Sequence, residues 1–363
     1  MDNDFMKNEY RTLIPTNEIQ NIESLPFKKK TLGRCPRAYD AARYAIHKCY
    51  LAKHTGDTEW APLWSQLMGE IAGNNSQWAL AKDALCIGGY LECDQKCEKG
   101  RKSYCFRLGP MLANAEWGYS KNNLLLPEDT RPKWEGLDLD HELAHRLVDS
   151  IAGQRDWNPR VTKGWHTRVD QFSPHYEICK TGRAYSDANQ FPKELRDALV
   201  IDGEATVEID VVNCQPMLLA TLYPEQSSEW MRYKALAEAG EVYEALGRFA
   251  GLKRNEAKEQ FIPFIFGGKR PVAEEFFKSE FPELLAAISQ RRKASYKRLV
   301  YELQGKESSV IVERLCKEFR AVSIHDGIRV KQSEASYAKQ RLLEVFETEW
   351  GLCPQVTVGG RLN

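Results

Sequence analysis

The chain has 363 residues, of which 42% are hydrophobic and 28% charged, so it can bury the cores of two domains and is not a disordered or fibrous protein. Lys plus Arg and Asp plus Glu both number 51, so the net charge gives no support for a nucleic-acid partner and only local clusters can. Ten scattered cysteines indicate a reducing, cytoplasmic setting. The sequence shows neither a signal-peptide pattern nor a run of about eighteen apolar residues, so we expect no membrane partner.

The first third of the chain predicts a basic arm followed by a small helical domain. Residues 1–36 are polar and contain a cluster of Lys and Arg, and residues 37–135 form the predicted domain. The spacing of apolar residues favours three helices, with Ser76 as the N-cap of the third. These helices are expected over residues 38–52, 63–72 and 76–86.

A basic hairpin is predicted to follow these helices. Residues 90–108 alternate in polarity around a glycine-containing tip that includes Lys99, Arg101 and Lys102. Helix, turn, helix and basic hairpin together resemble a winged helix-turn-helix. This resemblance implies that the last helix and the three basic residues contact a DNA duplex, and the alternative is a purely structural domain.

Two patterns suggest zinc, each with a simpler interpretation. Four cysteines lie near the hairpin, but only Cys93 and Cys97 have the close spacing of a structural zinc site. Cys86 and Cys105 are the other two, and on a hairpin Cys93 and Cys105 fit as half-buried residues. Farther on, His141 and His145 have the H-E-x-x-H spacing of a zinc protease, yet charged residues surround them and predict a solvated helix face.

Two aspartates lie on predicted strands of the region 136–363. Asp210 interrupts the apolar strand of residues 204–212, where a carboxylate is costly to bury unless it is paired or binds a metal. Asp326 follows a second apolar strand and precedes a turn at Gly327. Carboxylates on neighbouring strands can hold two divalent cations for phosphoryl or nucleotidyl transfer.

The segments around these aspartates resemble motifs of the family A (Pol I-like) DNA polymerases, in the family's order. Residues 181–192, TGRAYSDANQFP, are similar to a primer-template-binding segment, and Asp210 stands at the motif A aspartate. The R-x3-K-x7-Y/F-G pattern of motif B, the Q-G segment and the H-D of motif C follow. Their residues here are Arg254, Lys258, Phe266 and Gly267, then Gln304 and Gly305, then His325 and Asp326.

The resemblance implies an α+β polymerase core, with an antiparallel palm sheet and reduced helical fingers, in residues 136–363. Asp210 and Asp326 would hold two Mg²⁺ ions, or Mn²⁺, and Lys258 would act with them in catalysis. Arg254, Lys258, Phe266, Gln215 and Ile262 would bind the nucleoside triphosphate. Arg183, Gln304 and His325 would hold a DNA primer-template. A compact replication polymerase of a phage, plasmid or other mobile element is the implied function.

Several positions differ from the family pattern and leave alternatives open. Gln215 stands where Glu usually crowds a ribose 2′-hydroxyl, and Ile262 replaces a common aromatic residue. Both favour the alternative of a primase or single-subunit RNA polymerase that uses ribonucleotides. Pro263 predicts a kink in motif B, and Gly327 removes the usual acidic residue, with Glu208 as a possible spare carboxylate. A catalytically inactive DNA-binding replication factor is the third hypothesis.

Overall fold

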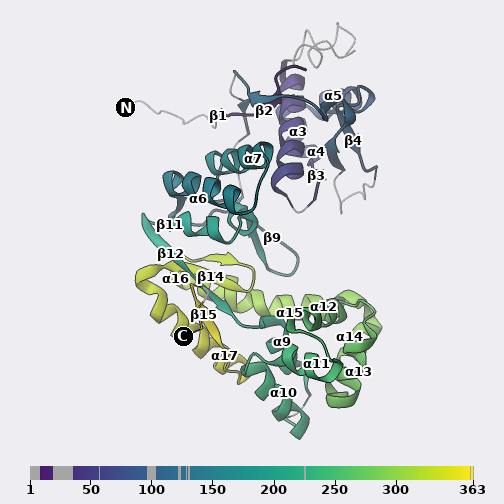
Figure 1. The fold of residues 1–363 in the computed structure, drawn as a ribbon, viewed down its shortest axis with the longest axis vertical. Helices are drawn as coiled ribbons and strands as arrows, with labels where there is room; N and C mark the ends of the chain where they lie inside the picture. Colours follow the sequence, from purple (N-terminus) through teal and green to yellow (C-terminus); the bar gives the residue numbers. More distant parts are fainter. Residues whose placement is uncertain are drawn as a thin grey trace. The chain divides into compact units, whose positions relative to one another are not determined.

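In the computed structural model the chain forms two compact units, whose placement relative to each other is not defined (Figure 1). Unit 1 comprises Met1–Thr130 and His145–Phe172, and unit 2 comprises Arg131–Ala144 and Ser173–Asn363. The predicted boundary at residue 136 lies close to the first of these crossings. The structure describes residues 9–18, 36–56, 58–95, 104–121, 124–127, 129, 131–224, 226–359 and 361–362. Most of the predicted arm therefore lies outside the described residues, as do Cys97, Lys99, Arg101 and Lys102.

Three helices form the centre of unit 1, and all three were predicted. They are α3 (Pro36–Thr55), α4 (Ser65–Ala72) and α5 (Asn75–Ile87). Small residues such as Ala41 and Ala45 on α3 are fully buried and let the other helices approach closely. The predicted cap at Ser76 was wrong, because the Asn74 side chain accepts the backbone N–H of Gln77 at 2.9 Å and caps α5 two residues earlier.

Short antiparallel strands surround these helices. The largest sheet of unit 1 has the order β3–β5–β4, in which β4 and β5 form the predicted hairpin. Two further pairs, β1 with β7 and β2 with β6, bring the start of the chain against residues 117–125. The bounds are β1 Glu9–Tyr10, β2 Leu13–Pro15, β3 Ala61–Pro62, β4 Leu91–Cys93, β5 Cys105–Leu108, β6 Trp117–Tyr119 and β7 Leu124–Leu125.

Two later helices complete unit 1. Helix α6 (His141–Gln154) contributes its residues from His145 onward, and α7 (Pro159–Asp170) follows. Asn158 caps α7 by accepting the backbone N–H groups of Arg160 and Val161, and Pro159 occupies the first turn, where its missing N–H costs nothing. Helix α7 packs on α3.

An antiparallel sheet organises unit 2, with the path β13–β14–β12–β11–β8 and β15 paired to the end of β12. Strand β12 (Glu204–Val211) lies at its centre, and its fully buried Ile209 alternates with partly exposed neighbours. Helix α17 (Ala335–Trp350) packs against β12, β14 and β15. The other strands are β8 Leu137–Leu139, β11 Leu199–Ile201, β13 Val322–Ile324, β14 Gly327–Lys331, β15 Val356–Val358 and β16 Arg361–Leu362. A separate hairpin joins β9 (Tyr176–Ile178) and β10 (Ala184–Ser186).

The remainder of unit 2 is a group of helices (Figure 1). Their core contains a cluster of aromatic rings, in which Phe277 contacts Phe261, Phe264, Phe276 and Phe281. The helices are α8 Asp187–Gln190, α9 Cys214–Leu219, α10 Ser228–Glu238, α11 Val242–Ala250, α12 Arg254–Ile265, α13 Pro271–Glu280, α14 Pro282–Ala294 and α15 Tyr296–Val310. A π-helical segment, Ile311–Leu315, and α16 (Cys316–Phe319) continue from α15. The structure is therefore a mixed helix and antiparallel-sheet protein, as predicted.

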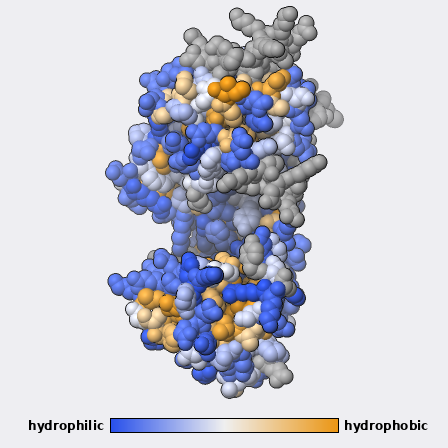
Figure 2. Space-filling view, turned by 90° about the vertical axis from the view of Figure 1, so that its right-hand side faces the viewer, coloured by the Kyte–Doolittle hydropathy of each residue, from blue (hydrophilic) through white to orange (hydrophobic). Residues whose placement is uncertain are grey.

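The face drawn in Figure 2 is mainly hydrophilic, with scattered apolar patches. Ile87 at the end of α5 is 83% exposed, and Met231 on α10 is 57% exposed. Among the described residues, no helix has the length and apolar character needed to cross a bilayer.

Candidate active site

The site is built where the β13–β14 hairpin meets the end of β12. Asp210 of β12 pairs in register with Gly327 of β14, the residue that follows Asp326. His325 and Asp326 form the two-residue turn of the hairpin, and His325 has a φ of 54°, in the left-handed region that is uncommon for residues other than glycine. Two aspartates far apart in the sequence are thus brought side by side, as the strand patterns predict.

Gly327 allows this close approach. A Cβ atom at position 327 would lie 2.6 Å from the backbone oxygen of Ile209 and 3.1 Å from Oδ1 of Asp210. Any larger residue would therefore push β14 away from β12 at the point where the two carboxylates meet. Steric crowding therefore explains why position 327 is Gly and not the acidic residue of the pattern described above.

The pKa values of both carboxylates are raised, chiefly by burial. Burial, followed by the negative charges of Asp326 and Glu208, raises the pKa of Asp210 to about 7. Burial also raises the pKa of Asp326, against the positive charges of Arg183, His325 and Lys258. A hydrogen bond joins the two carboxyl groups. Because like charges this close need a shared proton or a cation, the pair is suited to divalent metal ions.

Helix α12 carries the two predicted cations. Both Arg254 and Lys258 are exposed, and the positive charge of Lys258 lowers the pKa of Asp326. The Arg254 guanidinium donates to Oε1 of Glu244 at 2.6 Å and to Oδ1 of Asn213 at 3.3 Å, and lies 5.4 Å from the Tyr243 ring centre. These contacts hold Arg254 against Tyr243, whose pKa is raised by burial and by the negative charge of Asp326.

The end of α12 presents its less polar residues. Ile262 and Phe266 are half-buried, and the backbone N–H of Phe266 donates to the Ile262 carbonyl at 3.2 Å. Gly267, with a φ of 89°, terminates the helix at the position that the sequence predicts. Pro263 lies in the last turn of α12, and the kink expected there stays a prediction.

Arg183 is held by a partner that the sequence analysis missed. Glu307 of α15 is 1% exposed and accepts two hydrogen bonds from Arg183, at 2.6 Å to Oε1 and 2.7 Å to Oε2. Gln215 of α9 donates its amide N–H to the same carboxylate, while its own Oε1 is buried with no partner among the described residues. Glu307 lies between Leu303 and Ile311 in a buried stripe with helical spacing. A single carboxylate in this apolar stripe was the sequence feature that could have indicated a buried ion pair.

The remaining predicted residues of unit 2 lie on the same elements. Gln304 is half-buried on α15, one turn before Glu307. His325 is exposed in the turn next to Asp326, and burial followed by the charge of Arg196 lowers its pKa. Glu208 is not a free spare carboxylate, because it forms ion pairs with the buried Arg329 at 3.4 Å and with Arg196 at 3.8 Å.

The zinc patterns of the sequence have a different outcome. Cys86, Cys93 and Cys105 are half-buried, and the described part of the chain does not gather them into a metal-ligand group. Their predicted partner Cys97 lies outside the described residues. His145 is hydrogen-bonded to Asp170 at 3.0 Å and to His166 at 2.7 Å. His145 therefore belongs to a polar cluster on the surface of unit 1.

Comparisons with known proteins leave the family unassigned. No protein-family model matches the chain, and no curated protein matches it. Among solved structures, it is similar to the POL domain of Pol1 from M. smegmatis in complex with a DNA primer-template and dNTP. The TM-score is 0.38 and the identity 15%, over 58% of this chain and 54% of that chain. This chain thus spans about half the length of that domain.

Proposed function

We propose that unit 2 is a template-directed nucleotidyltransferase of the DNA polymerase type, which adds nucleotides to a 3′-hydroxyl. The observation that carries the proposal is the pairing of Asp210 and Asp326 across adjacent strands, with Lys258 close enough to alter the pKa of Asp326. In this proposal the sheet that contains β12 serves as a palm, and helices α10–α15 serve as reduced fingers.

Asp210 and Asp326 would hold the two Mg²⁺ ions. Four carboxylate oxygens from a half-buried pair match the hard oxygen ligands that Mg²⁺ prefers, and a cation would remove the repulsion that raises the pKa of Asp210. When bound, the ions would lower the pKa of the primer hydroxyl and offset negative charge on the triphosphate. A new bond then joins the 3′-oxygen to the α-phosphorus, while the bond from that phosphorus to the pyrophosphate breaks.

The cations of α12 have separate roles in this proposal. Lys258, exposed near Asp326, would contact the triphosphate and give a proton from Nζ to the leaving pyrophosphate. Arg254, braced by Glu244 and Asn213, would position the outer phosphates as a preorganised donor. Phe266 would offer a flat surface to the new base pair.

Arg183, Gln304 and His325 would hold the primer-template. Glu307 keeps the Arg183 guanidinium in one orientation, so its remaining N–H groups are available in a fixed direction. The preference for dNTPs or rNTPs is a separate question. Gln215 is tied to Glu307 and would line the sugar site, which keeps a primase or RNA polymerase as the alternative.

Unit 1 would supply a second DNA contact as a winged helix. The order α3, β3, α4, α5, β4, β5 and the sheet order β3–β5–β4 support this proposal. Lys99, Arg101 and Lys102 at the hairpin tip would meet the phosphates of the duplex. Helix α5 offers less, because Leu80 and Ile87 are exposed on it and its only Lys, Lys82, is half-buried.

The test is extension of a labelled primer on a DNA template with Mg²⁺, with dNTPs or rNTPs in separate reactions. We expect Asp210→Asn and Asp326→Asn each to reduce extension by at least about 1,000-fold, since each removes a charge that the transition state requires. Glu204→Gln, at the far end of the same strand, is the matched control and should retain activity. Extension that survives both aspartate substitutions, or no extension with either nucleotide set, would contradict the proposal.

A further inference from the structure

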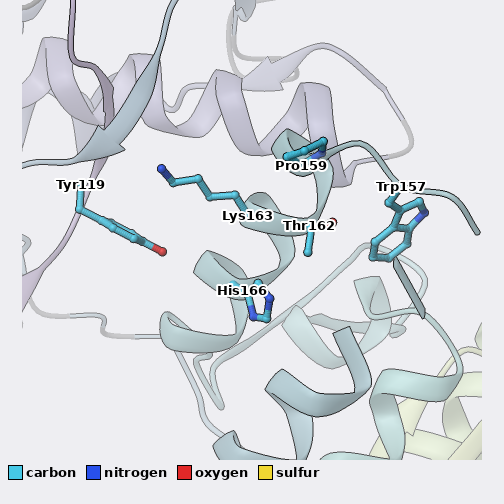
Figure 3. Close-up of a pocket in the computed structure, with 6 residues that line it drawn as sticks. All are labelled: Tyr119, Trp157, Pro159, Thr162, Lys163 and His166. Carbon is cyan, nitrogen blue, oxygen red and sulfur yellow. The ribbon is translucent and has the colours of Figure 1, made fainter. Parts of the chain in front are cut away.

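A pocket in unit 1, on the outer face of α7, is separate from the carboxylate site. It has a volume of about 540 Å³ and is lined by Tyr119, Trp157, Pro159, Thr162, Lys163 and His166 (Figure 3). This volume falls in the range of small-ligand sites. Tyr119 and Trp157 lie at opposite ends, with the α7 side chains between them (Figure 3).

The aromatic walls are held in place. Trp157 is stacked on the buried Trp165, with ring centres 6.0 Å apart and planes at 16°. The Tyr119 hydroxyl is hydrogen-bonded to Oγ1 of Thr167 at 2.9 Å. Two fixed rings at the edges of an open pocket suit a flat, aromatic ligand, which would lose little protein entropy on binding. Arg11 lies 5.1 Å from the Tyr119 ring centre and Arg155 lies 6.0 Å from the Trp157 ring centre, so such a ligand would also meet these cations.

The polar groups of the pocket favour an anion. Lys163 lies between the aromatic walls, 5.6 Å from the Tyr119 ring centre, and donates one hydrogen bond to the Trp117 carbonyl. Its other two N–H groups can meet a ligand oxygen. Burial lowers the pKa of Lys163, which indicates a partly desolvated cation that an anionic ligand would stabilise.

A histidine pair lies beside Lys163. His166 stacks on His145 at 4.9 Å, with their Nδ1 atoms 2.7 Å apart, and their Nε2 atoms face Asp149 and Asp170 at 2.9 and 3.0 Å. Both carboxylates thus have a histidine partner, and Lys163 is the cation that the pocket lining offers to an anionic ligand.

We infer that this pocket binds one nucleotide of single-stranded DNA, with its base against Trp157 or Tyr119 and its phosphate on Lys163. Bases in a duplex are stacked on one another and cannot enter, whereas an unpaired base can stack on an aromatic side chain. A phosphodiester carries a single negative charge and matches one ammonium group, while a free nucleotide monophosphate carries about two. The inference does not depend on the nucleotidyl transfer proposed for unit 2.

The first arm of the test locates the contact on the full-length protein. An oligonucleotide of about 12 residues, a length within the usual range for such sites, carries 5-iododeoxyuridine and is photo-crosslinked in EDTA. We expect the crosslinked peptides to contain Trp157 or Tyr119. Crosslinks confined to unit 2 would overturn the inference.

The second arm measures affinity by fluorescence anisotropy. Trp157→Ala should weaken binding about tenfold, and Trp157→Phe, which keeps a ring face, should restore most of it. Lys163→Gln should weaken binding about fivefold and lower the salt dependence by about one charge. Lys48→Gln is the matched control, because Lys48 of α3 also lies over a tyrosine ring in unit 1, 5.8 Å from the Tyr44 ring centre.

Two outcomes of the second arm contradict the proposal. Wild-type affinity in both Lys163→Gln and Trp157→Ala, together with an unchanged crosslink pattern in Trp157→Ala, would show that the pocket takes no part. Competition by dTMP as effective as competition by the oligonucleotide, at equal nucleoside concentration, would show a mononucleotide site instead of a strand site.

Discussion

The two units place their polar residues in opposite ways. In unit 2, residues from four distant segments meet around Asp210 and Asp326, and most are held by charged partners. In unit 1, the predicted DNA-contacting cations belong to one hairpin tip, and the helix before it exposes Ile87. Chemistry at a carboxylate pair needs convergence that only the tertiary fold supplies, whereas contact with a phosphate backbone needs only a local run of charge.

A methyl group added between β14 and β12 should disrupt the site of unit 2 most strongly. In Gly327→Ala, the new Cβ would lie 2.6 Å from the Ile209 carbonyl, so β14 must shift and separate Asp326 from Asp210. We expect primer extension to fall at least about 100-fold, since misplacement of about 1 Å has this cost in a preorganised site. Gly305→Ala, where the added Cβ has nothing within 4 Å, is the control for stability. Full activity in Gly327→Ala would show that the strand spacing does not matter.

The buried ion pair of unit 2 should dominate its local stability. Glu307→Ala leaves Arg183 and the Gln215 amide without their acceptor, and we expect a loss of about 3 kcal/mol in the free energy of unfolding. Glu302→Ala on the same helix removes a half-exposed partner of Arg291 and should cost less than about 1 kcal/mol. Urea denaturation of both variants measures the difference. Equal losses would show that burial of the Arg183 pair adds nothing.

The contrast between Asp210 and Glu307 also shows what the sequence could predict. Asp210 was found because a charge inside an apolar strand is conspicuous locally, and the strand pattern placed Asp326 beside it. Glu307 was missed because its role depends on Arg183, which the β9–β10 hairpin brings from far away in the sequence. The role of Gly327 follows from the register of β12 and β14, which a local sequence pattern does not predict.

The wrong prediction of the α5 cap also concerns a contact that a local sequence pattern does not show. Several residues in a row before α5 can cap a helix, and the sequence alone does not choose among them. The structure selects Asn74 because its side chain reaches the Gln77 N–H. The main helices were predictable in both units, since their apolar spacing is local. The predicted arm was wrong at residues 9–15, which form β1 and β2 and bury Leu13 and Ile14.

The carboxylate pair should also give unit 2 a distinctive response to pH. The pKa of Asp210 is raised from 3.8 to about 7, so the folded state holds the proton more tightly than the unfolded chain does. The stability from this proton is complete below about pH 4 and is lost as the pH rises to about 7. Asp210→Asn should therefore be more stable than wild type at pH 8, on the order of 2 kcal/mol, and close to it at pH 5.

Urea denaturation in EDTA at the two pH values measures this difference. Asp202→Asn is a control of opposite sign, because a hydrogen bond from Lys331 lowers the pKa of Asp202. Adding Mg²⁺ at pH 8 should stabilise the wild type and leave Asp210→Asn nearly unchanged. The same stability difference at both pH values would rule out the repulsion between the carboxylates.

The smallest effect is expected from the hairpin tip of unit 1. Changing Lys99, Arg101 and Lys102 to Ala removes phosphate contacts without changing the carboxylate site, so affinity for duplex DNA should fall only about fivefold at physiological salt. Primer extension at saturating DNA should stay the same, because the chemistry resides in unit 2. Changing Lys53, Lys278 and Lys317 to Ala alters the net charge equally at exposed positions and is the matched control. If both triple variants lose affinity to the same extent, the loss reflects overall charge, and the local run of cations that distinguishes unit 1 has no special part in binding.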